Sequence, residues 1–309
     1  MEYVATYISH SQELSDQQIS KITNKIESQF AIKSTRSKRL GKRANDTYFI
    51  INDSKNVKNV ISEIIDYYSK EIDISIQKND ENRKFKKMMV FDMDSTLIYQ
   101  EVIELIASYA DVEDKVREIT NRAMNNEIDF KESLKQRVQL LKGLKIDTLY
   151  DDIKEKIVVT KGVPELVKFM QLEQGTKFSV LSGGFIQFAD YIGDKLKFDY
   201  RRANLLEVDD EGRLTGNTIG EIVDGECKAN TIQQLCSKDK FDIDIKSTVM
   251  VGDGGNDLRA MATAGFGIAW NAKPIVQQQA PSRLNTDSML DILYMFGYTD
   301  DEIESRLSN

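Results

Sequence analysis

The sequence predicts an α/β protein in which a parallel sheet with a helical insertion follows a small α+β module. Three observations predict this class. After residue 88, strand-sized apolar segments alternate with helical periodicity, which favours a parallel sheet. Between the first two of those strands, residues 101–160 show helical periodicity only. Residues 1–85 carry six short elements in the order strand, helix, strand, strand, helix, strand.

The N-terminal elements follow from local patterns. Ser15 can cap a helix with apolar residues at helical spacing, and residues 72–76 alternate apolar and polar side chains, as a half-buried strand does. A polar, charged stretch at 78–87 follows, so we expect domains at 1–85 and 86–309. In chain order, the six expected elements lie at 3–8, 15–30, within 33–43, and at 47–51, 57–68 and 72–76. Their order is that of a ferredoxin-like sandwich, and it resembles ACT-type regulatory modules.

The larger region is expected to form a Rossmann-like parallel sheet with a helical cap inserted at about 101–160. Residues 205–219 carry Asp210-Glu211-Gly212 between two extended runs, which predicts a hairpin. The core strands that we expect are residues 88–91, 177–181, 198–200, 248–251 and 266–269.

Composition and charge narrow the class of protein. The chain has 309 residues, of which 40% are hydrophobic and 30% charged, and its formal net charge is −8. This acidity argues against nucleic acid or an anionic membrane as a partner. We recognise no signal peptide and no apolar run long enough to span a membrane. Cys227 and Cys236 give no disulfide framework, so we expect a cytoplasmic protein.

The first chemical signal is the pair Asp92 and Asp94, directly after the strand expected at 88–91. Open α/β sheets bind ligands beyond the carboxyl ends of their strands, where two carboxylates at i and i+2 can meet one metal ion and one substrate. A polar turn that closes a strand is the alternative for an isolated motif of this kind. A calcium loop is excluded, because it needs Gly and Glu where Leu97 and Ile103 stand.

The second signal is the loop GDGGND at residues 252–257, which presents Asp253 and Asp257 after another expected strand. A dinucleotide loop would need a third glycine where Asp257 stands, and a P-loop would need Gly-Lys-Ser or Gly-Lys-Thr. Hard cations such as Mg²⁺ prefer carboxylate oxygens. Two acidic strand ends in one parallel sheet therefore predict a magnesium site.

Two further signals are weaker when each is taken alone. Ser182-Gly183-Gly184 follows a third expected strand, and a hydroxyl beside amides freed by glycine suits phosphoryl oxygens. Taken alone, that tripeptide is better explained by a plain turn. Lys228 alone would be interpreted as a solvated surface charge.

Taken in order, the four signals resemble the four motifs of the haloacid dehalogenase superfamily, over residues 88 to about 275. Glu101, and Arg137 in the insertion, resemble the phosphoserine phosphatase branch of that superfamily. The whole chain, with its N-terminal module, resembles the fungal form of the branch. The resemblance implies Mg²⁺-dependent hydrolysis of O-phospho-L-serine to L-serine and phosphate, the last step of phosphorylated serine biosynthesis.

The resemblance also implies catalytic roles. Asp92 would attack phosphorus to form a phosphoaspartate, with one of its oxygens on the metal ion. Asp94 would protonate the leaving oxygen and then take a proton from water, while its main-chain carbonyl ligates the metal ion. Lys228 would balance the charge on Asp92 and on the phosphoryl oxygens. The reaction calls for such groups, because two anions must approach each other and an alkoxide leaves poorly.

The remaining motif residues would bind the metal ion and the phosphoryl group. By the same resemblance, Asp253 would be the third protein ligand of Mg²⁺, and Asp257 would orient the waters on the metal ion. Ser182, the Gly183 amide and Asn256 would hold the phosphoryl oxygens.

Four residues of the cap region would recognise the serine part of the substrate. The resemblance implies that Glu101 holds the ammonium group, and that Arg137, whose guanidinium can grip a carboxylate in a bidentate manner, holds the carboxylate. Met124 and Phe130 match apolar positions that close over the substrate. Without the resemblance, Arg137 would be interpreted as a surface cation of a helix.

Several interpretations stay open. A related phosphatase could act on another small phosphomonoester, but Glu101 and Arg137 speak against it. A non-catalytic amino-acid sensor could keep a decayed core, but the intact motif carboxylates speak against that. Transfer to free serine would use the same phosphoenzyme as hydrolysis. For the N-terminal module, a homodimer contact, a structural role and serine sensing all stay open.

Overall fold

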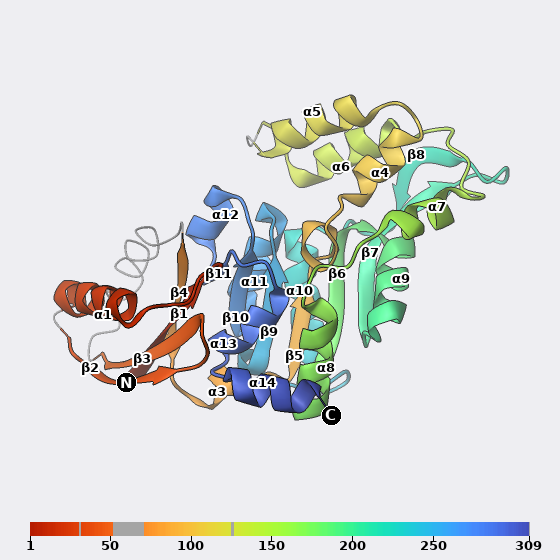
Figure 1. The fold of residues 1–309 in the computed structure, drawn as a ribbon. Coiled ribbons are helices and arrows are strands. Elements are labelled where there is room, and N and C mark those ends of the chain that lie inside the picture. The colour runs from red at the N-terminus through yellow and green to blue at the C-terminus, as the bar shows by residue number, and fades with distance from the viewer. Residues whose placement is uncertain (31, 52–70, 125–126, 309) are drawn as a thin grey trace.

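The chain forms two sheets that lie side by side (Figure 1). The structure is a computed structural model that describes residues 1–30, 32–51, 71–124 and 127–308. The smaller sheet has four strands in the order β2-β3-β1-β4, and the larger has seven in the order β11-β10-β9-β5-β6-β7-β8. Among the described residues, no helix has the length and apolarity needed to cross a membrane.

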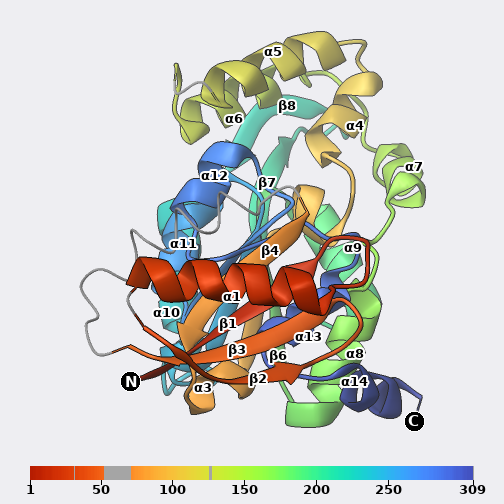
Figure 2. The same ribbon diagram turned by 60° about the vertical axis from the view of Figure 1, so that its left-hand side comes forward.

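The smaller sheet is antiparallel, and α1 covers one of its faces (Figure 2). Ile22 and Ile26 of α1 are buried there against the sheet. Ser15 caps the helix as predicted, because its Oγ accepts the N–H of Gln18 at 3.2 Å. The helix expected at 57–68 lies outside the described residues. The elements are β1 (Glu2–Ser9), α1 (Asp16–Phe30), β2 (Ser34–Arg39), β3 (Ala44–Ile50) and β4 (Ile72–Lys78). The strand order of this sheet is that of the expected ferredoxin-like sandwich.

The second face of this sheet is also buried, which corrects the expectation of a half-buried strand at 72–76. Asp73 and Ser75 are at most 1% exposed, as is Asp46 on β3. Asp73 accepts the side-chain amide of Asn285 at 2.8 Å, and Ser75 bonds Ser282. Alternation in the sequence was therefore a sign of two different buried surroundings, one apolar under α1 and one polar against the larger sheet.

The charged stretch at 78–87 is packed against both sheets. It contains a short helix, α3 (Glu81–Lys84), whose Arg83 is 6% exposed and pairs with Asp46 at 2.7 Å. Arg83 also donates to the carbonyl of Met295 at 3.2 Å. Gln77 donates to the same carbonyl at 2.7 Å. A buried charge requires such partners, so this stretch fixes the smaller sheet to the C-terminal segment.

The larger sheet is parallel except for its last pair, β7 and β8. Its strands are β5 (Met88–Phe91), β6 (Lys177–Phe185), β7 (Tyr200–Val208), β8 (Leu214–Ile219), β9 (Thr248–Gly252), β10 (Phe266–Trp270) and β11 (Arg283–Leu284). The hairpin expected at 205–219 is present as β7 and β8.

The strand expected at 198–200 was placed too early. Lys197 adopts a left-handed conformation (φ 58°) at the end of a helix, and the N–H of Phe198 returns to the carbonyl of Gly193 at 2.8 Å. This is a helix C-terminal motif, so the apolar Phe198 belongs to the helix end and the strand begins at Tyr200.

The expected helical insertion at about 101–160 is observed, and it lies above the carboxyl ends of the strands (Figure 1). Its helices are α4 (Val102–Ser108), α5 (Glu113–Met124), α6 (Phe130–Gln139) and α7 (Leu149–Lys156). The β7–β8 hairpin joins it, since Gly143 donates to the carbonyl of Leu214 at 2.8 Å and Leu214 donates to that of Leu144 at 2.8 Å.

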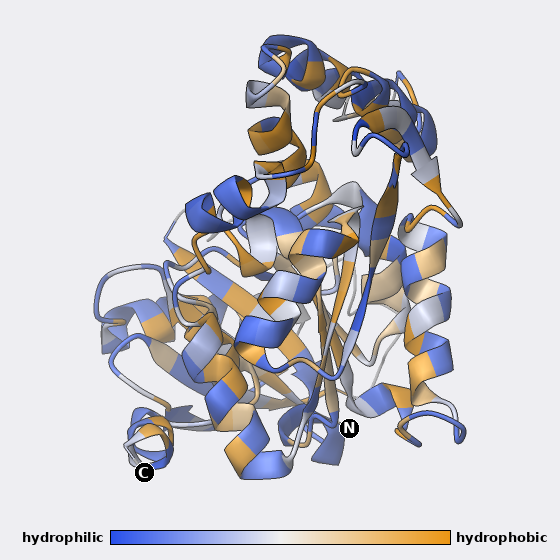
Figure 3. Cartoon of the chain, turned by 90° about the vertical axis from the view of Figure 1, so that its right-hand side faces the viewer, coloured by the Kyte–Doolittle hydropathy of each residue, from blue (hydrophilic) through white to orange (hydrophobic). Residues whose placement is uncertain are grey.

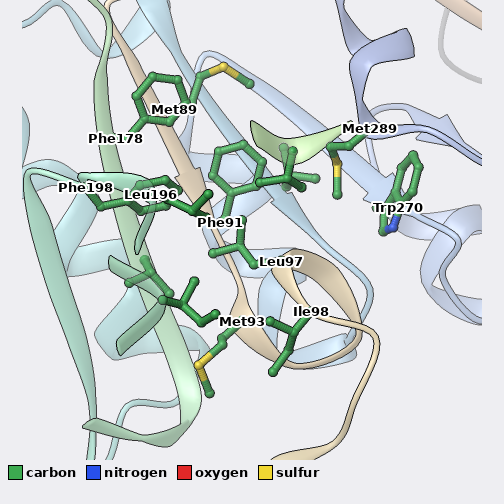
Figure 4. Packing of buried hydrophobic residues seen from close by; sticks show 14 of the residues in the cluster. Met89, Phe91, Met93, Leu97, Ile98, Phe178, Leu196, Phe198, Trp270 and Met289 are labelled. Carbon is green, nitrogen blue, oxygen red and sulfur yellow. The ribbon is translucent and has the colours of Figure 1, made fainter. Parts of the chain in front are cut away.

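Helices flank the sheet, and its strands are largely apolar between them (Figure 3). In the core, the rings of Phe91, Phe178 and Phe198 pack with centroids 5.4 to 6.3 Å apart (Figure 4). The remaining helices are α8 (Val163–Gln174), α9 (Ile186–Leu196), α10 (Gly225–Cys236), α11 (Leu258–Thr263), α12 (Pro274–Gln279), α13 (Ile292–Met295) and α14 (Asp300–Leu307), with short turns η1 (Met93–Leu97), η2 (Ile245–Ser247), η3 (Gly255–Asp257) and η4 (Met289–Asp291).

Candidate active site

The first element of the site is the turn that follows β5. The carboxylate of Asp92 accepts the N–H of Met93 at 2.7 Å, and the N–H of Ile98 closes the turn on the carbonyl of Met93 at 3.1 Å. Within the turn, Ser95 adopts a left-handed conformation (φ 53°). Because the N–H of Asp92 also bonds the carbonyl of Val251 at 2.9 Å, the turn is fixed to the end of β9.

Lys228 connects the two acidic strand ends. It lies in the first turn of α10, its side chain is 0% exposed, and its Nζ is 3.0 Å from Asp92 Oδ2 and 2.7 Å from Asp257 Oδ1. Asp224 caps the same helix by accepting the N–H of Cys227 at 2.8 Å. The lysine that sequence alone would place at the surface is therefore a buried cation between two carboxylates.

Three carboxylates converge beside this lysine. One oxygen each from Asp92, Asp253 and Asp257 lies within 4.8 Å of the others. Thr96 donates to Asp253 at 3.2 Å. Carboxylate oxygens at such spacing are the donors that hard divalent cations prefer, so the residues present fit a divalent metal ion. The carboxylate of Asp94 is not part of this group, and the contribution expected of Asp94 is its main-chain carbonyl.

Burial and mutual repulsion dominate the electrostatics of the cluster. Burial, followed by the charges of Asp92 and Asp257, raises the pKa of Asp253 well above its ordinary value. Burial and Asp92 raise the pKa of Asp257 to about 7, against the opposing effect of Lys228. Burial alone would lower the pKa of Lys228, but the two carboxylates raise it. A divalent cation would offset the same repulsion, which supports the fit.

The glycine loop at the end of β6 faces Asp94 and the cap. A Cβ on Gly183 would lie 2.7 Å from the Phe130 ring and 3.3 Å from Asn256 Nδ2, and a Cβ on Gly184 would lie 2.4 Å from Asp94 Oδ2. Glycine at both positions lets the loop come this close to the two side chains. The loop therefore brings main-chain amides close to Asp94, Asn256 and the start of α6.

Ser182 and Asn204 hold this loop from within. Ser182 is 0% exposed, and its Oγ accepts the N–H of Gly184 at 2.8 Å. Asn204, on β7 and 1% exposed, donates to the carbonyl of Gly183 at 2.8 Å and accepts the N–H of Val223 at 2.8 Å. Sequence reasoning missed Asn204. Its strand also carries Arg201, Arg202 and Glu207, so a polar residue there gave no distinct signal.

Glu101 and Arg137 are the residues expected to recognise the serine part of the substrate. Ser95 donates to Glu101 at 2.7 Å. Burial raises the pKa of Glu101, and Asp92 adds to that effect. Burial lowers the pKa of Arg137, while the charges of Glu101 and Asp94 act on that pKa in the opposite sense. Arg137 is half-buried, and its Nε donates to the carbonyl of Ser133 at 3.3 Å.

Asp94 is another strongly perturbed acid of the candidate site. Burial, followed by the charges of Glu101 and Asp92, raises its pKa well above the ordinary value. One of its oxygens accepts the N–H of Val102 at 3.0 Å. Met124 ends α5, and its side chain lies outside what the structure describes.

The site combines a buried cation, converging carboxylates and a glycine loop at the edge of a parallel sheet. This arrangement suits an enzyme that hydrolyses phosphate esters. The family model of haloacid dehalogenase-like hydrolases matches residues 86–265. A second model, for a protein of unknown function (DUF705), matches residues 3–124.

Comparison with individual relatives narrows the class of hydrolase. The chain is 55% identical to the phosphoserine phosphatase of Saccharomyces cerevisiae, over 99% of each chain. A solved structure described as a probable phosphoserine phosphatase from Vibrio cholerae matches with TM-score 0.70 and 28% identity, over 98% of this chain and 88% of that one. Another, described as a phospho-aspartyl intermediate analogue of phosphoserine phosphatase, matches with TM-score 0.63 and 37% identity, over 68% of this chain and 99% of that one.

The chain is therefore a haloacid dehalogenase-like hydrolase. Within that class it belongs to the phosphoserine phosphatase family, and it is an enzyme of the phosphoric monoester hydrolase type.

Proposed function

We propose that the chain hydrolyses O-phospho-L-serine to L-serine and phosphate, with Mg²⁺ as cofactor, through a phosphoaspartate on Asp92. The observation that carries the proposal is the buried Lys228, which contacts both Asp92 and Asp257 beside Asp253. The names of the relatives support phosphoserine as the substrate. In the cell, we place this reaction in the cytoplasm, as the last step of phosphorylated serine biosynthesis.

In the first step, an oxygen of Asp92 attacks phosphorus. Lys228 stays charged throughout and reduces the repulsion between this carboxylate and the phosphate dianion. Bound Mg²⁺, with Asp92, Asp253 and the Asp94 carbonyl as protein ligands and Asp257 orienting its waters, would supply further charge neutralisation. The bond between phosphorus and the serine oxygen breaks as the phosphoaspartate forms.

Asp94 serves as general acid and then as general base. Its raised pKa suits a carboxyl group that holds a proton until the serine oxygen departs. After departure it is a carboxylate, which can take a proton from the water that attacks the phosphoaspartate. Both steps place Asp94 on the leaving-group side, consistent with its contact to the loop at Gly184.

Recognition divides between the loop and the cap. Ser182, the Gly183 amide and Asn256 hold the phosphoryl oxygens, and Phe130 and Met124 close over the substrate. Glu101 pairs with the ammonium group and Arg137 with the carboxylate. Placing the two readers in the cap region means that the serine part is enclosed when the cap covers the phosphoryl site.

The test is phosphate release from O-phospho-L-serine, compared with phosphothreonine, a sugar phosphate and an aryl phosphate, with and without Mg²⁺. We expect a strong preference for phosphoserine that needs Mg²⁺ and disappears in Asp92→Asn. Activity spread evenly over the panel would remove the substrate assignment. A folded wild-type protein that releases phosphate from none of these compounds would remove the function.

A further inference from the structure

Glu101 lies at the N-terminal end of α4, but its side chain does not cap the helix. It is the N-cap residue of α4, yet its side chain makes no capping hydrogen bond. Asp94 accepts the N–H of Val102 in its place, at 3.0 Å. The carboxylate of Glu101 is therefore free to turn away from the helix axis, and something else must orient it.

Ser95 supplies that orientation. Its Oγ donates to Glu101 Oε1 at 2.7 Å, and its N–H bonds the carbonyl of Gln100 at 3.2 Å. Ser95 has a positive φ of 53°, a backbone conformation that is unfavourable for most residues other than glycine and asparagine. Unfavourable backbone conformations of this kind persist where the surroundings demand them, often at sites of function.

We propose that Ser95 is a positioning residue that fixes Glu101 for the substrate ammonium, and so sets the preference for phosphate esters that carry an amino group. The inference rests on the proposed function. The hydroxyl has one proton and directs it to Oε1, so that the other oxygen of Glu101 meets the ammonium. Hydrogen bonds to charged groups are the strong ones, and losing this one would leave the carboxylate of Glu101 without its fixed direction.

A purely structural role would predict a different result. If Ser95 only closed the turn between Asp92 and Glu101, its loss would displace the nucleophile and impair every substrate alike. A positioning role for Glu101 predicts loss only where the substrate has an ammonium group. Two substrates that differ in that group alone separate these cases.

The experiment uses the full chain with saturating Mg²⁺. We would measure kcat/KM for O-phospho-L-serine and for O-phospho-3-hydroxypropanoate, which is the same molecule without the amino group. Ser95→Ala should lower the value for phosphoserine about ten-fold and leave the value for the deaminated ester within about two-fold. Ser95→Asn should recover most of the loss, because asparagine tolerates positive φ and can donate a hydrogen bond.

Two controls complete the design. Ser108→Ala removes another serine hydroxyl of the α4 region, one that donates to the carbonyl of Leu105 at 2.7 Å, and should leave both substrates unchanged. In a Glu101→Gln background, Ser95→Ala should cause no further change in substrate preference.

Equal losses on both substrates, or an unchanged preference in Ser95→Ala, would overturn the role of Ser95 while leaving the proposed function in place. If the wild-type enzyme itself made no distinction between the two esters, the proposed serine recognition would fall, and the role of Ser95 with it.

Discussion

Lys86 is buried just before β5, at the opposite end of that strand from the site, and its replacement should stabilise the protein. The residue is 2% exposed, and its Nζ lies 5.4 Å from the Phe266 ring centroid and 5.3 Å from that of Phe296. Burial lowers the pKa of Lys86 from 10.5 to about 8, a shift that Asp80 opposes. An amine that is harder to protonate in the folded chain costs free energy wherever it is charged.

The magnitude follows from the shift. The difference of about 2.5 pKa units (10.5 − 8), at 1.36 kcal/mol per unit, corresponds to about 3 kcal/mol at neutral pH. Attraction between the Lys86 ammonium group and the two aromatic rings offsets about 1 kcal/mol of this cost. Lys86→Met, which keeps the volume, should therefore raise the free energy of unfolding by about 1–3 kcal/mol at pH 7.

The pH dependence gives a sharper test. Because the folded pKa is depressed, the unfolded chain binds the proton more tightly between about pH 8 and pH 10.5, and wild-type stability should rise with pH across that window. Urea unfolding of both proteins should show the advantage of Lys86→Met shrinking as pH rises from about 7 to about 10. Lys87→Met, at an exposed neighbour, should change stability by less than about 0.5 kcal/mol. A Lys86→Met protein less stable than wild type at pH 7, or an advantage independent of pH, would refute the reasoning.

Three further outcomes are expected. Arg137→Ala should lower kcat/KM for phosphoserine by about 10²-fold or more and largely spare an aryl phosphate, because only phosphoserine has a carboxylate to lose its partner. Asn204→Asp should lower kcat about ten-fold on both substrates, since it removes the donor to Gly183 O in a loop that serves every phosphate ester. Arg83→Met should lower the free energy of unfolding by about 3–5 kcal/mol, measured by urea, because it leaves the buried Asp46 charge without a cationic partner.

Each of the three has a matched control. Arg122→Ala removes a cap cation that pairs with Glu127 at 3.7 Å, and should not change substrate preference. Asn217→Asp alters an exposed amide of β8 and should not change kcat. Arg36→Met breaks a pair with Glu2 at a side chain 55% exposed, and should cost less than about 1 kcal/mol. A variant that behaves like its control would contradict the corresponding argument.

The acidic centre was predictable because it depends on local order and on sheet geometry. Asp92 and Asp253 each follow an apolar strand, and parallel strands bring their carboxyl ends to one edge. The position of Lys228 was harder to foresee, since only the packing of α10 against that edge buries its side chain. The family resemblance predicted a catalytic role for Lys228, whereas its spacing in the sequence alone did not.

Long-range contacts were beyond sequence reasoning. Asn204 forms hydrogen bonds to Gly183 and Val223, in two segments whose approach depends on the whole sheet. No pattern near Asn204 in the sequence predicts these two partners. The β7–β8 hairpin was predicted, but its pairing with residues 143–145 of the cap was not, because a loop pairs there with a distant strand. The buried polar face around Asp73 was misjudged for the same reason.

The attachment of the smaller sheet to the C-terminal segment also bears on how the chain is made. Arg83 and Gln77 donate to the carbonyl of Met295, and Arg43 pairs with Asp291 at 2.6 Å. On the ribosome, a sheet translated first must therefore wait for partners translated more than 200 residues later. Until residues 291–295 emerge, the polar face of that sheet stays bare, so a truncated product would present it to solvent and to the chaperones that survey new chains.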